Sequence, residues 1–381
     1  MKHILHIVSV YFSLSYFIGD QFQYFGNKGY KMFVICSPSK ELEEYSKKQK
    51  FQYKEIEILR KISILKDLLA IKKIYVYIKK NKIDIVTGHS PKGALLSMIA
   101  AYLARVPKRI YFRHGLVYET SHGIKRYLLK FIDRITALCS TKVVCVSPSL
   151  YKKSIDDHLW SKNKQIILSK GTCNGINIQK FEKENIDISK KDDLREKLNV
   201  PKNILIIGFV GRLVRDKGII ELVEAFQLLS KKRNDIYLLL VGMFEKRDAL
   251  PNEVKNEIIN NPHIIYTDYV DNSQIEYYYS LMDLFILPSY REGFPTSILE
   301  ASAMKLPVIT TRVTGCIDAI IASTTGIFID HDANEIFKSL DLLLDDKKER
   351  LRLGENGRLF VEENFEQIII WREIEKLYQD E

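Results

Sequence analysis

Short apolar runs rich in β-branched residues alternate with longer segments of helical periodicity along almost the whole chain. In the first half, the expected strands are Ile4–Val10, Met32–Cys36, Ile83–Thr87, Arg109–Phe112 and Lys142–Val146. The expected helices of that half are Ile62–Lys80, Gly93–Ala104 and Ile124–Leu138. Such alternation is typical of βαβ units, which build a parallel sheet with helices on its faces.

The pattern pauses at a polar, charge-rich stretch, residues 182–193, and then begins again. The second set of expected strands is Ile204–Val210, Ile236–Val241, Ile264–Tyr266, Leu284–Leu287 and Val308–Thr310, with helices over Gly218–Leu229, Ser273–Ser280 and Thr296–Met304. We interpret the polar stretch as a linker. The sequence therefore predicts an α/β fold of two Rossmann-like, doubly wound domains, residues 1–185 and 195–365, that face each other across a cleft. An apolar stripe predicts a last helix over Phe365–Glu381.

The length of 381 residues suits two domains, and the charge is divided unevenly between them. Residues 1–190 contain 34 basic and 15 acidic side chains, whereas residues 191–381 contain 24 basic and 33 acidic ones. The overall charge of +10 is thus the sum of a strongly basic first half and an acidic second half. We expect the first half to attract anionic partners.

Several other protein classes are disfavoured. The five cysteines form no C-x-x-C pair, which argues against a zinc knuckle and a thioredoxin site and favours buried thiols in a reducing cytosol. His3 and His6 interrupt the apolar N-terminus, so we expect a buried strand there rather than a signal peptide. No apolar run reaches the ~18–20 residues of a membrane-spanning helix. No pattern of a nucleic-acid-binding module occurs, so nucleic acid is not an expected partner.

One candidate site lies where an expected strand passes into an expected helix. The strand ends at Pro288, and Pro295 is expected at the first position of the helix, a place that proline favours. Such a helix start leaves free backbone N–H groups near Thr296 and Ser297, together with the positive end of the helix dipole. A phosphate group could bind there.

Two glutamates accompany this helix start. Glu292 lies in the loop and Glu300 lies further along the expected helix, so that both could flank one ligand. An ionised carboxylate only accepts hydrogen bonds and can hold the hydroxyls of a diol. The alternative is two solvated glutamates beside a helix, and their spacing alone does not decide between the two.

A second cluster follows the first expected strand of the second half. Gly211 permits a tight turn, and Arg212 and Lys217 could converge on one anion. Two cations beside a helix start form a pyrophosphate clamp. The alternative interpretation is ordinary surface charge.

Taken in order along the chain, these elements resemble the signature of family-4 glycosyltransferases, which have the GT-B fold. The matching pieces are Gly211-Arg212, Lys217-Gly218, Pro288-Ser289 and the E-x7-E element from Glu292 to Glu300. Asn174-Gly175-Ile176-Asn177 with Phe181 is similar to an element that precedes the family's linker, and Val146-Ser147 to the end of its last N-domain strand. The resemblance covers nearly the whole chain. It implies that the last helix, within residues 366–381, crosses back onto the N-terminal domain.

The resemblance also implies a retaining sugar transfer and a role for each matching residue. Arg212 and Lys217 would bind the donor diphosphate and stabilise it as a leaving group. Glu300 would hold the ribose hydroxyls and Glu292 would contact the donor sugar. His114 matches the N-domain histidine that reaches the donor sugar, although a lone histidine is more often structural. The remaining donor-binding positions would be Gly211, Gly293, Phe294, Pro295 and Thr296.

Three segments depart from the family pattern. The Gly-Gly pair expected after the first strand is replaced by residues 13–20, in which Gly19 is the one glycine. The later Gly-Gly-x-x-Glu element reads Thr314-Gly315-Cys316-Ile317-Asp318, with Asp318 in the acidic place. Asp330-His331-Asp332 has the D-x-D form, but it lies in the wrong context for a metal site. We interpret it as a loop and expect no metal or other cofactor.

The basic first half offers two candidate surfaces. Basic residues interleave with apolar ones over the first surface: Arg60, Lys61, Lys66, Lys72, Lys73, Lys79, Lys80 and Lys82. The second set is Arg105, Lys108, Arg109, Arg113, Lys125, Arg126, Lys130 and Arg134. One interpretation is a solvated helix face. The other is docking on the anionic inner leaflet of the cell membrane, each nearby cation contributing ~1 kcal/mol, beside a polyprenyl-diphosphate-linked acceptor.

The segments Arg113–Glu119 and Val146–Ser149 are similar to bacterial family members of polysaccharide and glycan assembly. The resemblance implies transfer of a hexose or N-acetylhexosamine from a nucleotide-diphosphate donor, a UDP-sugar, to a lipid-linked saccharide in capsule or lipopolysaccharide synthesis. The enzyme would be cytoplasmic and peripheral on the inner face of the membrane. The alternatives are a nucleotide-sugar epimerase on the same fold and an inactive nucleotide-sugar-binding protein. The residues do not identify the base or the sugar.

Overall fold

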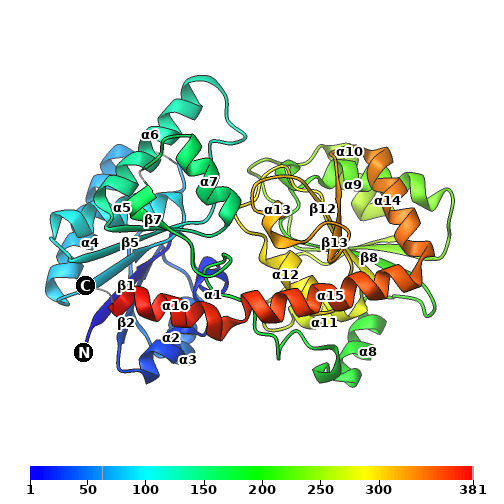
Figure 1. Ribbon diagram of the computed structural model, residues 1–381, viewed down its shortest axis with the longest axis horizontal. Coiled ribbons are helices and arrows are strands. Elements are labelled where there is room, and N and C mark those ends of the chain that lie inside the picture. Colours follow the sequence, from blue (N-terminus) through cyan, green and yellow to red (C-terminus); the bar gives the residue numbers. More distant parts are fainter. Residues whose placement is uncertain (62, 161, 380–381) are drawn as a thin grey trace. The chain divides into compact units, whose positions relative to one another are not determined.

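The computed structural model describes residues 1–61, 63–160 and 162–379, and Figure 1 shows its helices and strands. The chain divides into two compact units. The first contains Met1–Gly175 and the C-terminal segment from Ile368, and the second contains Ile176–Gln367. Each unit is built on its own parallel sheet.

The described part of the first unit contains a seven-stranded sheet in the order β3-β2-β1-β4-β5-β6-β7. The strands are β1 His3–Ile7, β2 Lys31–Cys36, β3 Gln52–Glu55, β4 Ile85–Gly88, β5 Lys108–Arg113, β6 Lys142–Cys145 and β7 Gln165–Ile166. All their described pairings are parallel. The helices are α1 Ser13–Phe17, α2 Gln21–Asn27, α3 Leu42–Gln49, α4 Ile64–Lys80, α5 Pro91–Leu103, α6 Gly123–Cys139, α7 Pro148–Asp156 and α16 Gln367–Gln379.

The chain reverses its direction of travel across this sheet between β1 and β4. It moves outward from β1 to β2 and β3, and then returns to place β4 on the other side of β1. His6 of β1 is opposite Thr87 of β4 in the register. In open parallel sheets, ligands bind beyond the carboxyl ends of the strands at such a switch point.

The described part of the second unit contains a six-stranded sheet in the order β10-β9-β8-β11-β12-β13. The strands are β8 Leu205–Val210, β9 Ile236–Val241, β10 Ile264–Tyr266, β11 Leu284–Leu287, β12 Val308–Thr311 and β13 Gly326–Ile329. The helices are α8 Ile188–Lys197, α9 Ile219–Ser230, α10 Asn252–Asn260, α11 Ile275–Leu281, α12 Thr296–Ala303, α13 Cys316–Ala319, α14 Ala333–Asp345 and α15 Lys347–Phe365. The switch point of this sheet lies between β8 and β11.

The central strands of the second sheet, β8, β9 and β11, have nearly continuous apolar sequences, as expected for strands that are covered on both faces. In the second unit, Leu284, Phe285, Ile286 and Leu287 of β11 are fully buried. Helices α9 and α14 pack against each other, and so do α12 and α15.

The stretch at residues 182–193, which the sequence suggested as a linker, lies inside the second unit. Its C-terminal part continues into α8, which packs against α11. This segment is rich in charged residues because no side chain of α8 is buried. The charge does not indicate a passage between the two units. The chain instead crosses between the units after Gly175 and again after Gln367.

The last helix, α16, belongs largely to the first unit. The indole Nε1 of Trp371 donates to the carbonyl oxygen of Asn174 at 3.0 Å, and Nζ of Lys108 donates to that of Tyr378 at 3.1 Å. The sequence predicted helices over Ile62–Lys80 and Phe365–Glu381. Helix α4 begins at Ile64, and residues 62, 380 and 381 lie outside the described residues.

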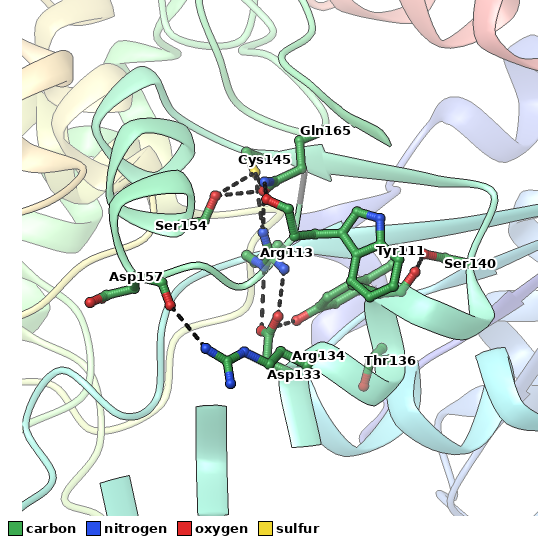
Figure 2. Close-up of polar contacts among 12 residues, drawn as sticks. Tyr111, Arg113, Asp133, Arg134, Thr136, Ser140, Cys145, Ser154, Asp157 and Gln165 are labelled. Carbon is green, nitrogen blue, oxygen red and sulfur yellow. Dashed lines mark hydrogen bonds and ion pairs between the residues drawn. The ribbon is translucent and has the colours of Figure 1, made fainter. Parts of the chain in front are cut away.

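A buried arginine connects three elements of the first unit, as Figure 2 shows. Arg113, at the end of β5, is completely buried and forms an ion pair with Asp133 of α6 at 2.5 Å. Its Nη1 also donates to Oε1 of Gln165 in β7 at 2.5 Å, and the hydroxyl of Tyr111 donates to Asp133 at 3.0 Å. Burial lowers the pKa of Arg113, but the attraction of Asp133 outweighs this effect and leaves that pKa above its ordinary value.

None of the helices in the described residues is long and apolar enough to cross a membrane. The five cysteines are free thiols, and all except the half-buried Cys139 are buried.

Candidate active site

The two clusters singled out in the second half of the sequence meet at one switch point. Residues 211–218 follow β8 and residues 288–295 follow β11, and these strands are neighbours in the sheet. Since both strands run in the same direction, both loops leave the sheet at its carboxyl edge. The fold therefore brings the two clusters together.

An ion pair between Lys217 and Glu292 joins the two loops. The side chains of Lys217 and Glu292 are 16% and 11% exposed, so water reaches the pair only in part. The hydroxyl of Ser289 also donates to Glu292, at 2.7 Å. The ammonium group of Lys217 is thus partly desolvated and is held at the carboxyl edge of the sheet by Glu292. The carboxylate of Glu292 in turn accepts a second hydrogen bond, from Ser289.

Two glycines allow the loops to approach this closely. Gly218 has φ +69°, and a Cβ placed on it would lie 2.1 Å from the carbonyl oxygen of Pro288. Gly315, before α13, has φ +82°, and its Cβ would lie 2.5 Å from the carbonyl oxygen of Gly293. No other residue fits these positions without moving the backbone.

Arg212 and Lys217 do not converge on one carboxylate. Arg212 forms an ion pair with Glu245, in the segment after β9, and its side chain is 43% exposed. Asp216, which lies between these two residues in the sequence, accepts a hydrogen bond from Nη2 of Arg291 at 2.7 Å. The second unit therefore holds its cations at this edge in separate ion pairs.

Glu300 lies within α12 and is buried. The hydroxyl of Tyr279, on α11, donates to its Oε2 at 2.8 Å. Burial raises the pKa of Glu300 to about 7, while the Tyr279 hydrogen bond opposes that shift. Glu300 is therefore a buried carboxyl group that exchanges its proton near neutral pH.

Helix α12 begins at Thr296, where the predicted helix Thr296–Met304 begins, but Pro295 is not its first residue. Pro295 is extended and precedes the helix, which begins at Thr296, and no side chain caps this end. The ring of Phe294 packs against that of Phe365, with centroids 5.3 Å apart. The N–H group of Ile298 donates back to the carbonyl oxygen of Pro295 at 3.1 Å, which leaves the N–H groups of Thr296 and Ser297 to a ligand or to water.

The segment Asp330-His331-Asp332 has a structural role. Asp332 caps α14 by accepting from the N–H of Glu335 at 2.9 Å. His331 stacks on Tyr290, with centroids 3.8 Å apart, and its Nε2 lies 2.9 Å from the carbonyl oxygen of Ser289. In the part of the chain that the structure describes, no group of three or more His, Cys, Asp and Glu side chains has the geometry to hold a metal ion.

In the first unit, His114 follows β5 and contacts another histidine. Its Nε2 lies 3.0 Å from Nδ1 of His89, the residue after β4. Phe17 stacks on His114 with centroids 3.7 Å apart. Phe17 ends α1, so the segment that replaces the expected Gly-Gly pair forms a short helix and places an aromatic ring on the candidate histidine.

Several members of the second basic set are used inside the first unit, whereas Arg105, Lys125 and Arg134 are exposed. Arg113 is buried, and Arg109 donates from Nε to the carbonyl oxygen of Cys139 at 2.6 Å. Lys130 pairs with Asp157 at 2.8 Å, and Arg134 donates to the carbonyl oxygen of His158 at 3.0 Å. These cations stabilise the fold because their partners come from neighbouring elements.

Sequence reasoning named Ser289 only as part of the family signature. It missed the other polar side chains that support the candidate residues: Tyr279, His89, Thr87 and His6. The available signal for the first unit was the presence of histidines at or just beyond the ends of β1, β4 and β5, which are neighbours in the sheet. Tyr279 could not be found in this way, because helix packing alone brings α11 to α12.

Three comparisons place the chain among known proteins. Residues 190–360 match the family described as "Glycosyl transferases group 1", and residues 4–147 match "Glycosyl transferase 4-like". The chain is 33% identical to the capsular polysaccharide biosynthesis glycosyltransferase CapM of Staphylococcus aureus, over 99% of this chain and 97% of CapM.

The chain is also 26% identical to the UDP-Gal:alpha-D-GlcNAc-diphosphoundecaprenol alpha-1,3-galactosyltransferase of Escherichia coli, over 86% of this chain and 84% of that protein. A crystal structure of a glycosyltransferase from Rickettsia africae matches the fold with a TM-score of 0.79 at 25% identity. That match covers 99% of this chain and 98% of the other.

Proposed function

The chain belongs to the group 1, family-4 glycosyltransferases, which retain the configuration of the transferred sugar, and we propose that it moves a hexose or N-acetylhexosamine from a UDP-sugar to a lipid-linked saccharide. The acceptor would be a polyprenyl-diphosphate-linked intermediate of cell-surface polysaccharide synthesis. Support comes from CapM, a capsule biosynthesis enzyme, and from the E. coli relative, whose name specifies a UDP-sugar and a diphosphoundecaprenol acceptor.

The observation that carries the proposal is the Lys217–Glu292 pair at the switch point of the second sheet. In the proposed mechanism, the donor diphosphate takes the place of Glu292 as the partner of Lys217. As the bond to the sugar breaks, negative charge develops on the departing phosphate. A fixed, partly desolvated ammonium group stabilises that charge more in the transition state than in the ground state. Arg212 and the first-turn N–H groups of α12 add further positive potential.

The other residues of the site would orient the donor. Ionised Glu300 accepts hydrogen bonds from the ribose hydroxyls, for which a buried carboxylate is suited. Glu292, released from Lys217, accepts from a hydroxyl of the sugar. Gly211, Gly293, Phe294, Pro295 and Thr296 line the sugar and the phosphates, and His114 of the first unit donates to the sugar.

For the acceptor, we propose that the first unit binds an anionic membrane surface through α4 and α6, which both pack against α5. Helices of parallel α/β units run opposite to their strands, so both helices begin at the carboxyl edge of the sheet. Four apolar side chains near these helix starts are strongly exposed: Leu65 is 78%, Ile64 69%, Ile124 88% and Tyr127 75% exposed.

Exposed lysines accompany the apolar side chains. Lys61, Lys72, Lys73 and Lys125 are all exposed, and α4 has its buried face at Ala70, Ile74 and Ile78. Apolar side chains that can enter the headgroup region, flanked by cations, match an anionic leaflet. A peripheral position on the inner face of the membrane would bring the carboxyl edge of the first sheet close to a lipid-linked acceptor.

A panel of nucleotide sugars tests the enzymatic proposal. Each is incubated with the full chain, first alone and then with a polyprenyl-diphosphate-linked saccharide, and the products are analysed by mass spectrometry and NMR. We expect transfer from one UDP-sugar with retained configuration, and a strong loss of transfer in Glu292→Ala. An epimerised sugar formed without acceptor identifies the epimerase instead, and binding without turnover identifies an inactive sensor.

Vesicle flotation tests the membrane proposal. We expect the chain to float with vesicles that contain anionic lipid and not with neutral vesicles, and we expect the double variant Leu65→Ser, Ile124→Ser to float less. Leu342→Ser with Leu351→Ser is the matched control, because these exposed leucines lie on α14 and α15 of the second unit. Equal flotation with neutral and anionic vesicles, or equal loss in both double variants, rejects this surface.

A further inference from the structure

Three histidines and a threonine form one continuous polar chain through the switch point of the first sheet. Nδ1 of His6 lies 2.7 Å from Oγ1 of Thr87, which lies 3.3 Å from Nε2 of His89. Nδ1 of His89 then lies 3.0 Å from Nε2 of His114. Thus the neighbouring strands β1, β4 and β5 deliver one hydrogen-bonded path from the core to His114.

The aromatic surroundings hold the imidazole rings in place. Phe17 stacks on His114, and Phe112 stacks on His89 with centroids 4.7 Å apart and planes within 12°. The ring of Phe22 meets His6 edge to face. Burial lowers the pKa of His6 and of His114 to about 3, and that of His89 well below its ordinary value. All three rings are therefore neutral at neutral pH, and each carries its proton on one nitrogen only.

Two arrangements of the protons satisfy every hydrogen bond along this polar path, and the donors point in opposite directions in the two. In the first, His6 donates from Nδ1 to Thr87, Thr87 donates to Nε2 of His89, and His89 donates from Nδ1 to Nε2 of His114. In the second, each donor becomes an acceptor. Both arrangements leave Nε2 of His6 and Nδ1 of His114 outside the path, and they differ in which of these two atoms carries a proton.

The buried end decides between them. Nε2 of His6 is buried and has no hydrogen-bond partner in the described part of the chain. The first arrangement leaves a lone pair there, whereas the second leaves a buried N–H group. An orphaned buried N–H group is rarer in folded proteins than an underused acceptor. The first arrangement is therefore favoured, and it leaves the proton of His114 on Nδ1.

We propose that Thr87, His89 and His6 are positioning residues that fix His114 as its Nδ1–H tautomer. His114 then presents a neutral N–H donor, because no described residue hydrogen bonds to its Nδ1. Its ligand is an oxygen that accepts a hydrogen bond, such as a sugar hydroxyl or a phosphate oxygen. The use of this donor in sugar transfer rests on the function proposed above, whereas the tautomer does not.

Ring-¹⁵N histidine NMR of the full chain measures the tautomer directly. Single His→Gln substitutions assign the three rings among the eight histidines. We expect a pyrrole-type Nδ1 and a pyridine-type Nε2 for His6, His89 and His114 in the wild-type chain. A pyrrole-type Nε2 on His114 in the wild-type spectrum overturns the proposal.

Removal of the Thr87 hydroxyl then tests whether the hydrogen-bonded path from His6 to His114, here called the relay, sets the tautomer of His114. The same variant separates this role from the proposed function. Thr87→Val is expected to convert His114 to a mixture of tautomers, and Thr87→Ser to restore the single one. Thr136→Val is the matched control, because Thr136 is a buried hydroxyl of α6 that donates to the carbonyl oxygen of Ile132. An unchanged His114 spectrum in Thr87→Val overturns the relay. A changed spectrum with unchanged sugar transfer supports the relay and rejects the role of His114 in the reaction.

Discussion

At the switch point of the second sheet the polar side chains carry full charges, whereas at that of the first sheet they are neutral rings. Lys217 and Glu292 form an ion pair between the loops after β8 and β11. His6, His89 and His114 form an uncharged chain across β1, β4 and β5. Two sheets of the same architecture therefore present different chemistry at corresponding places, one suited to a diphosphate and the other to hydroxyl groups.

Charge is present beside the first switch point too, but it faces the interior. Arg113 directly precedes His114 in the sequence, and its guanidinium group forms an ion pair with Asp133 and a hydrogen bond with Gln165 (Figure 2). The first unit uses this cation for folding, while the second unit keeps Lys217 at the edge of its sheet. The positive net charge of the first half therefore does not identify the unit that keeps a cation at the carboxyl edge of its sheet.

The largest expected effect is on the stability of the first unit. Asp133→Ala leaves Arg113 buried without its counter-ion, and we expect the free energy of unfolding to fall by about 3–5 kcal/mol. Urea-induced unfolding followed by circular dichroism measures this change. The exposed Asp156 of α7 provides the control, since Asp156→Ala should change stability by less than about 0.5 kcal/mol. Equal effects of the two substitutions would show that the buried pair has no such role.

The next effect is on the rate of transfer. Lys217→Ala removes the ammonium group that would stabilise the leaving diphosphate, and we expect kcat to fall about 10²–10³-fold. Steady-state assays with the UDP-sugar found active in the panel measure it. Lys232→Ala is the matched control, because Lys232 lies just after α9 and its side chain, which is 55% exposed, pairs with Asp341 of α14. A loss of stability without a loss of kcat would make Lys217 a purely structural residue, like Arg113.

A smaller effect concerns pH. Burial raises the pKa of Glu300 to about 7, so the acceptor-only carboxylate forms as the pH rises through that value. We therefore expect the affinity for UDP to increase as the pH rises from about 6 to about 8, and to return to its lower value when the pH is lowered to about 6. Isothermal titration calorimetry measures the affinity. Glu300→Gln should remove this part of the pH dependence and weaken binding at pH 8 by about tenfold. Identical pH profiles of the two proteins would contradict the ribose role.

Much of the fold could be predicted because both sheets are buried on both faces. Strands such as Leu284–Leu287 are then uninterrupted apolar runs, and their order along the chain places the loops after β8 and β11 at one edge. The short, exposed strand β3 gave no such signal, since residues 52–55 are mostly polar. The sequence suggested a linker at residues 182–193 because this stretch is polar and charged, but its C-terminal part belongs to the exposed helix α8 and the chain passes between the units after Gly175.

The candidate site could be predicted in its residues but not in its contacts. The order of Arg212, Lys217, Glu292 and Glu300 is visible in the sequence, yet nothing in it pairs Arg212 with Glu245 or places Tyr279 beside Glu300. Those contacts depend on how helices and loops pack across a sheet. The histidine path depends in the same way on the pairing of β1 with β4.

Hydrogen–deuterium exchange of the full chain, with and without UDP, tests most directly whether the charged switch point of the second unit binds the donor. We expect the strongest protection by UDP in peptides that cover residues 211–218 and 288–300, and a loss of that protection in Lys217→Ala. Protection confined to peptides of the first unit, or unchanged protection in the variant, would contradict the assignment of the donor diphosphate to this site.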